Sequence, residues 1–160
     1  MKVALAVAGI TTAAVRVSST LWTLSRDWRD APVDLHNLRD DVTRTERFFG
    51  EIQQTMNASR LAGPPTPKEA LPEASALQSD LRQLIDEGIS TLRRIEAIVD
   101  GLVVSAGVEG RSEEDKAKGD DIRKRRKFLW LLQSRKVAKL RKELSYTRSN
   151  ICRLLITRNM

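Results

Sequence analysis

The sequence predicts an all-α fold, an antiparallel bundle of four to five amphipathic helices. Apolar residues recur at spacings of three and four along most of the 160 residues, which is the period of a helix with one buried face. No segment alternates apolar and polar residues in the manner of a half-buried strand. The composition, 41% hydrophobic and 31% charged, suits a folded domain. Helices that each carry one apolar stripe can bury it only against each other, so we expect a single bundle domain over residues 1–160.

The first helix is predicted from apolar residues that are separated alternately by four and three positions. They are Val3, Val7, Ile10, Ala14, Val17, Leu21, Leu24 and Trp28. Thr12 and Arg16 fall on the opposite side, so this helix is amphipathic. A second stripe runs from Leu35 to Met56 and follows Pro32, a residue that suits a first helical turn.

Two loops separate the remaining stripes. The segment ASRLAGPPTPKEALP holds four prolines and one glycine, which excludes a continuous helix there. The segment SAGVEGRSEEDKAKGDD is polar and contains several glycines. Apolar stripes resume after each loop, and a break between the last two stays open near Ser134. We therefore expect helices near residues 3–26, 33–57, 75–103, 120–133 and 135–157.

The net charge of +7 is concentrated in the last third of the chain. From Arg111 onward there are 16 Lys or Arg and 6 Asp or Glu, a net charge of +10, so residues 1–110 carry −3. Such a field attracts phosphate groups, whether of nucleic acid or of an anionic lipid surface. The run RKRRK at 123–127 also fits an ordinary solvated helix face. Because the chain is only 4% aromatic and carries no recognition-helix pattern, nucleic acid is the least favoured partner.

Residue types suited to catalysis or cofactor binding are scarce in the sequence. His36 is the single histidine, and no second His or Cys stands at metal-ligand spacing from it. Cys152 lies beside the apolar Ile151 and is expected to be a buried, inert thiol. Neither a phosphate-binding glycine loop nor a dinucleotide-binding motif occurs. We therefore expect a non-enzyme that uses no cofactor and no metal.

The opening stretch MKVALAVAGITTAAVRVSSTLW admits three interpretations. A secretion signal fits the apolar start, but the amphipathic pattern continues to Trp28, past any plausible cleavage site. A permanent membrane span is disfavoured because the uncharged residues 3–15 cover only about 20 Å of a hydrocarbon core of about 30 Å. Extending the span to Leu24 places Arg16 inside the bilayer, which costs about 2.5–3.5 kcal/mol in free energy of insertion. The remaining interpretation is a helix that packs in a bundle yet is apolar enough to enter a membrane.

Small residues in the same stretch bear on this interpretation. Ala4 and Ala8, and likewise Gly9 and Ala13, are pairs of small residues four positions apart. Such pairs let helices approach closely inside lipid. They also allow tight packing in a soluble core, so both uses remain open at this point.

The order of these features resembles the N-terminal domain of fungal NLR-type and ankyrin-containing proteins, the HeLo-like family with its SesA relatives. The resemblance rests on the apolar opening helix VALAVAGITTAAVRVSSTLWTL, the segment DAPVDLHNLRDDV that leads into the second helix, and the Pro-rich loop. It also rests on the late basic stretch RKRRKFLWLLQSRKVAKLRKELSYTRSNICRLLI. It spans essentially the whole chain.

The resemblance implies a cell-death execution domain of fungal innate immunity and heterokaryon incompatibility, similar to the helical bundles that execute necroptosis. Such a domain is cytoplasmic and serves a sensor module in cis or trans. On activation it forms a homo-oligomer, is recruited to anionic lipids of the plasma membrane, exposes its N-terminal helix and permeabilises the membrane. The alternative function is a soluble helical signalling adaptor that mediates protein–protein interaction.

The working residues follow from this interpretation together with the patterns above. The membrane-inserting residues would be Val3, Leu5, Val7, Ile10, Val17, Leu21, Trp22 and Leu24. The close helix contacts would be made by Ala4, Ala8, Gly9 and Ala13. Arg16 would face a polar environment or the lumen of a pore. The residues that attract anionic lipid would be Arg123, Lys124, Arg125, Arg126, Lys127, Lys136 and Lys139.

Overall fold

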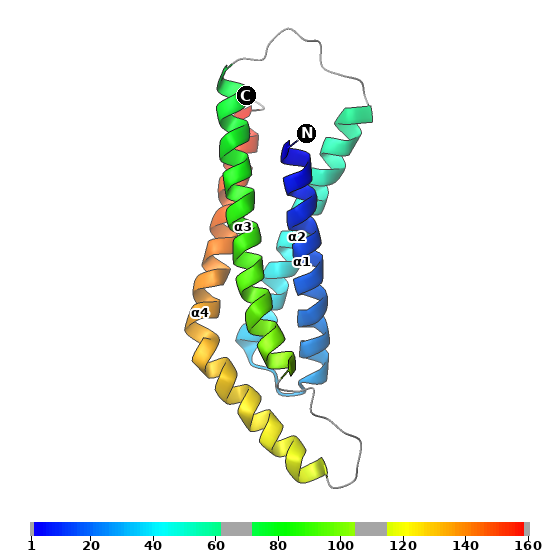
Figure 1. Ribbon diagram of the computed structural model, residues 1–160, viewed down its shortest axis with the longest axis vertical. Helices are drawn as coiled ribbons and strands as arrows, with labels where there is room; N and C mark the ends of the chain where they lie inside the picture. Colours follow the sequence, from blue (N-terminus) through cyan, green and yellow to red (C-terminus); the bar gives the residue numbers. More distant parts are fainter. Residues whose placement is uncertain (1, 62–71, 105–114, 159–160) are drawn as a thin grey trace.

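The computed structural model describes residues 2–61, 72–104 and 115–158 of the chain. Within these ranges the chain forms four helices and no strand. The helices are α1 (Lys2–Asp27), α2 (Val33–Leu61), α3 (Pro72–Val104) and α4 (Asp115–Arg158). The prediction of an all-α bundle is confirmed (Figure 1).

Prolines and short turns explain where the first helices begin and end. After α1, the N–H of Trp28 donates to the Leu24 carbonyl and the N–H of Ala31 donates to the Trp28 carbonyl, both at 3.0 Å. α2 begins directly after Pro32 and α3 begins at a proline, which lacks the N–H that would have no partner in a first turn. α2 continues past its predicted end at residue 57 to Leu61, because no helix-breaking residue intervenes.

α4 answers the question, left open by the sequence, of whether the helices expected near 120–133 and 135–157 are one or two, and it begins at Asp115, inside the segment predicted as a loop. These residues belong to one helix of 44 residues that runs through Ser134. No proline or glycine follows Gly119 in the sequence. The Ser134 hydroxyl donates to the Leu131 carbonyl at 2.8 Å, so its polar group has a hydrogen-bond partner inside the helix.

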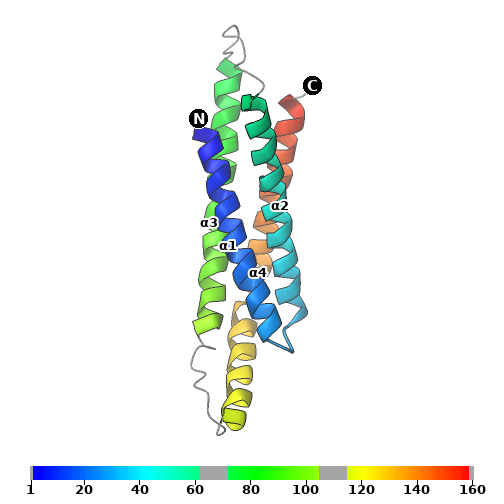
Figure 2. The same cartoon turned by 90° about the vertical axis from the view of Figure 1, so that its right-hand side faces the viewer.

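Successive helices run in opposite directions along the long axis of the molecule (Figures 1 and 2). α1 packs against α2 and α3, and α4 also packs against α2 and α3. α1 and α3 are therefore neighbours that run in the same direction, as are α2 and α4. α1 and α4 lie on one diagonal of the bundle and do not pack against each other.

The core is a column of apolar side chains that all four helices supply. α1 contributes its predicted stripe from Val7 to Leu24, and Trp28 follows directly after the end of α1. The other helices contribute Leu35, Leu38, Val42, Phe49, Ile85, Leu92, Ile95, Ile98, Val99, Leu102, Trp130, Val137, Leu140, Leu144 and Ile151. Val3 and Met56, near the start of α1 and the end of α2, are only partly buried. The start of α1 is therefore less completely covered than the middle of the helix.

α3 approaches α1 and α4 closely at Gly88. A Cβ atom at this position would lie 2.7 Å from Cδ1 of Ile10 on α1 and 3.3 Å from Cγ2 of Thr147 on α4. Ile10 is 0% exposed and Thr147 is 4% exposed, so an added methyl group requires Cδ1 of Ile10 to shift within the packed core. Gly50 of α2 differs, because no atom lies within 4 Å of the equivalent Cβ position.

We expect Gly88→Ala to leave the protein less stable than Gly50→Ala by about 1–3 kcal/mol in free energy of unfolding, the usual cost of overpacking a core. Both changes gain the same helix propensity, about 0.8–1.0 kcal/mol, so their difference isolates the steric effect. Denaturant unfolding of the two variants measures it. Equal stabilities would mean that the three helices do not meet at Gly88.

Candidate functional site

The apolar stripe of α1 lies in the core of the bundle. Of the eight residues predicted to insert into a membrane, five are buried: Val7, Ile10, Val17, Leu21 and Leu24. Val3 is half-buried. Leu5 and Trp22 lie outside the stripe, 75% and 54% exposed. In this conformation most of the candidate inserting surface is therefore occupied by α2 and α3.

α1 also meets the length and composition that a membrane span requires. Among the described residues one candidate span is found, Val3–Asp27, and 28% of its most apolar window is buried in the bundle. This fraction corresponds to about two buried residues in every seven, which is the share of a helix that a single narrow apolar stripe occupies. A core helix of a soluble protein and a signal sequence can pass the same test, so the composition of α1 alone does not distinguish these uses.

The small residues of α1 do not mark a close helix contact within the bundle. Gly9 is exposed, and a Cβ atom there would make ordinary contact with Cδ1 of Ile89 at 3.7 Å. Ala4, Ala8 and Ala13 are half-buried. The close approach occurs at Gly88 of α3 instead. A glycine among the apolar residues of a helix stripe is the sequence feature that could have indicated a close helix contact at this position.

Three polar contacts connect α1 to its neighbours. Arg16 is exposed, as predicted from its place opposite the stripe, and its Nε lies 2.8 Å from Oε1 of Glu96 on α3. The guanidinium of Arg39 on α2 stacks 4.3 Å from the ring centroid of Trp22. The third contact joins the hydroxyls of Ser18 and Thr43 at 3.3 Å.

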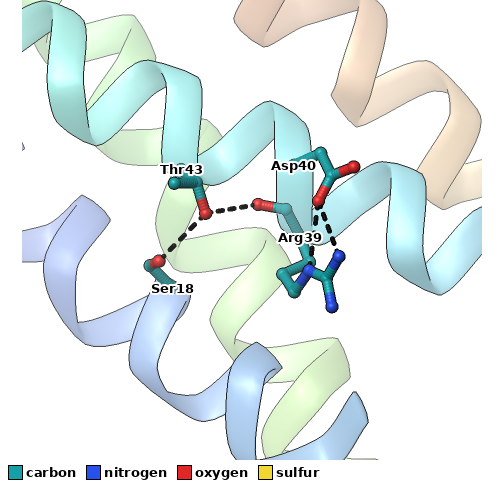
Figure 3. A network of polar contacts seen from close by, with 4 residues as sticks. All are labelled: Ser18, Arg39, Asp40 and Thr43. Atoms are coloured by element: carbon teal, nitrogen blue, oxygen red, sulfur yellow. Dashed lines mark hydrogen bonds and ion pairs between the residues drawn. The ribbon is translucent and has the colours of Figure 1, made fainter.

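The Ser18–Thr43 contact has a direction that the surrounding network determines. Thr43 Oγ1 already donates its single proton to the Arg39 carbonyl at 2.9 Å, so Ser18 is the donor to Thr43 (Figure 3). Arg39 also donates from Nε and Nη2 to Oδ1 of Asp40, at 3.1 and 2.9 Å. Asp40 thus orients the guanidinium that stacks on Trp22.

Apolar burial holds α1 in place more strongly than these polar contacts do. A fully buried aliphatic side chain contributes about 1.5–3 kcal/mol, and α1 buries several. An exposed ion pair contributes about 0–1 kcal/mol, and the Arg16 side chain is 75% exposed. α1 can therefore leave the bundle only where another apolar environment, such as lipid, receives its stripe.

The predicted basic surface of α4 is largely present. Six of its seven residues are exposed: Arg123, Lys124, Arg125, Lys127, Lys136 and Lys139. Arg126 differs from the prediction, because its side chain is only 8% exposed. It lies on the same face of α4 as the buried Trp130, which follows one turn further along. Its Nε has no hydrogen-bond partner among the described residues. In this conformation Arg126 does not belong to the exposed basic surface of α4.

A polar cluster between α2 and α4 was not predicted. Arg141 Nε donates to Oδ2 of Asp41 at 2.6 Å, and both side chains are more than two-thirds buried. Burial lowers the pKa of the neighbouring Arg148 guanidinium, while the Asp41 carboxylate opposes this shift. The partners are 100 positions apart, so no local spacing could have indicated the cluster, whose role is to fix α4 on α2.

Groups suited to catalysis are sparse in the described part of the chain. No group of three or more His, Cys, Asp or Glu side chains there could hold a metal ion. Cys152 is exposed rather than buried, because its neighbour Ile151 occupies the core position. A shallow cavity of about 270 Å³ lies between the start of α1 and the end of α2, lined by Ala4, Leu5, Val7, Ala8, Gln53, Met56 and Asn57.

Comparison of this chain with models of known protein families, with curated proteins and with solved structures finds no match. The functional argument therefore rests on the residues themselves. Those that stand out are the apolar helix α1 and the exposed basic surface of α4.

We expect Arg16→Leu to change the free energy of unfolding by less than about 1 kcal/mol, because only an exposed ion pair is lost. The same change removes an insertion penalty of about 2.5–3.5 kcal/mol, so binding to anionic vesicles should tighten in a co-sedimentation assay. Arg26→Leu is the matched control, since Arg26 is equally exposed but pairs with Asp27 at the end of α1. Identical responses of the two variants would contradict insertion of α1 past Arg16.

Proposed function

We propose that this chain is a membrane-targeting, self-associating cell-death execution domain of the HeLo-like type, in which α1 inserts into the membrane and permeabilises it. The single observation that carries the proposal concerns α1. This helix is long and apolar enough to cross a bilayer, and, like each of the four helices, it packs on two neighbours. Its removal would leave the contacts of α4 with α2 and α3 in place.

The conformation described above is the resting state in this proposal. Leaving the bundle uncovers the stripe of α1 and, at the same time, the apolar surfaces of α2 and α3 that covered it. Exposed apolar surface of this kind associates with lipid or with other copies of the chain. Release of α1 therefore favours both membrane insertion and homo-oligomerisation, and the small residues around Gly9 would serve close helix contacts in the assembled state.

The exposed cations of α4 would bring the domain to its target. The inner surface of the plasma membrane carries anionic lipids, and each Lys or Arg near such a surface contributes about 1 kcal/mol of attraction. A cytoplasmic domain with this charge is recruited to the membrane once a sensor module, in cis or in trans, exposes it. No cofactor or nucleic acid takes part in this scheme.

A soluble signalling adaptor is the second candidate function. The observation that favours it is the complete burial of the α1 stripe from Val7 to Leu24, which is what a permanently closed bundle requires. An adaptor would recruit partners through an exposed helix face and would leave lipid vesicles intact. The two functions therefore differ in whether α1 has to leave α3.

A reversible cross-link between α1 and α3 tests this difference. Arg16→Cys and Glu96→Cys, in a Cys152→Ser background, replace two residues in direct contact, so a short reducible dithiol-type linker can join them. We expect the linked protein to bind anionic vesicles but to release no trapped dye. Reduction of the linker should restore dye release, because α1 is then free to leave.

The matched control joins α3 to α4 without restraining α1. Arg94 and Glu143 are also in contact, with Nη1 2.9 Å from Oε2, and Arg94→Cys with Glu143→Cys accepts the same linker. This protein should still empty the vesicles. If both linked proteins release dye equally, α1 does not act by leaving α3; if the unlinked parent releases none, the adaptor is the better assignment.

A further inference from the structure

We propose that the outward face of α4 around Phe128, Leu131 and Leu132 is a docking surface that binds an anionic lipid membrane while the bundle is closed. These side chains are 61%, 69% and 63% exposed. They stand at positions i, i+3 and i+4 of one helix, so they form one continuous apolar surface. We call these three residues the α4 patch.

The fold itself directs the α4 patch outward. Arg126 and Trp130, which are 8% and 1% exposed, are each two positions away from Phe128, about 200° around the helix. The buried face of this segment is therefore opposite the patch. Because Trp130 belongs to the hydrophobic core, α4 cannot rotate to cover the patch without exposing a tryptophan.

Basic residues continue the same face of α4 on both sides of the patch. Those one helical turn before or after it are Lys124, Arg125, Arg135 and Lys136, all exposed. Aromatic and aliphatic side chains flanked by Lys and Arg are typical of a helix that lies in a membrane interface. The apolar groups then reach the acyl boundary, while the cations remain at the level of the lipid phosphates.

Charge favours a membrane over a second copy of the chain. Two copies that met through the α4 patch would place the same cations against each other, and like charges across a contact weaken it. An anionic lipid surface supplies the opposite charge. The first part of α4, drawn in yellow, extends beyond the lower ends of α1 and α3 in both views (Figures 1 and 2).

This inference rests on the proposed function for the choice of a membrane as partner, but it does not require insertion of α1. It separates recruitment from permeabilisation. The closed bundle docks through α4, and α1 leaves α3 afterwards.

The test uses the full chain with the α1–α3 cross-link of the Arg16→Cys, Glu96→Cys pair, so that α1 cannot contribute to binding. Phe128→Ser, Leu131→Ser and Leu132→Ser are combined in one variant. We expect its affinity for phosphatidylcholine vesicles that contain phosphatidylserine to fall at least about tenfold, because the apolar anchor is lost. The parent should bind pure phosphatidylcholine weakly.

Tyr146→Ser with Ile156→Ser is the matched control. These residues lie on the same helix and are 66% and 60% exposed, but they stand outside the patch, so vesicle binding should be unchanged. Circular dichroism verifies that both variants remain helical. An environment-sensitive fluorophore on Leu131→Cys, in the Cys152→Ser background, should shift to the blue on anionic vesicles, whereas one on Tyr146→Cys should not.

Two outcomes would overturn the inference. One is equal binding of the patch variant and its control, whatever the dye-release experiment shows. The other is a dimer of the parent in solution that the patch variant abolishes while vesicle binding persists, which would assign the patch to a second copy. If the patch variant loses binding and the α1–α3 link has no effect on dye release, the docking surface stands and the proposed role of α1 fails.

Discussion

The burial of one narrow stripe of α1 between α2 and α3 is the interaction on which the rest of the structure depends. Ile10, within that stripe, lies against Gly88 of α3, and Gly88 lies against Thr147 of α4. α1 is therefore coupled, through one glycine, to the helix that it does not itself pack against. Packed interiors have little free volume to absorb a displacement. A change in the position of α1 therefore affects both α3 and α4.

Polar contacts orient α1 but contribute little to holding it. Arg16, Ser18 and Trp22 each meet a partner on α2 or α3, and all three contacts are at least partly open to solvent. Contacts of this kind set rotation and register at low energetic cost. The stripe supplies the stability. In the proposed function, lipid covers the same stripe once α1 leaves the bundle.

α4 is organised differently from α1. One face joins the core through Trp130 and Leu140 and is tied to α2 by the Asp41–Arg141 ion pair. The other face carries cations and, over one short stretch, exposed apolar residues. Since α4 is continuous, the buried side of the helix fixes the direction of the exposed side. The molecule therefore presents a permanently exposed surface on α4 and a concealed one on α1.

Local sequence was sufficient for the fold class, for the stripe of α1 and for the position of Arg16 opposite it, because helical periodicity assigns each residue to a face. It also placed most helix boundaries, since proline acts locally. It could not decide that Ser134 continues a helix, that Arg126 faces inward and Cys152 outward, or that Gly88 is the point of closest approach. The helical periodicity of apolar residues shows which face of a helix is buried, but it does not show which other helix covers that face. Only the packing of four helices decided which surfaces became core and which remained exposed.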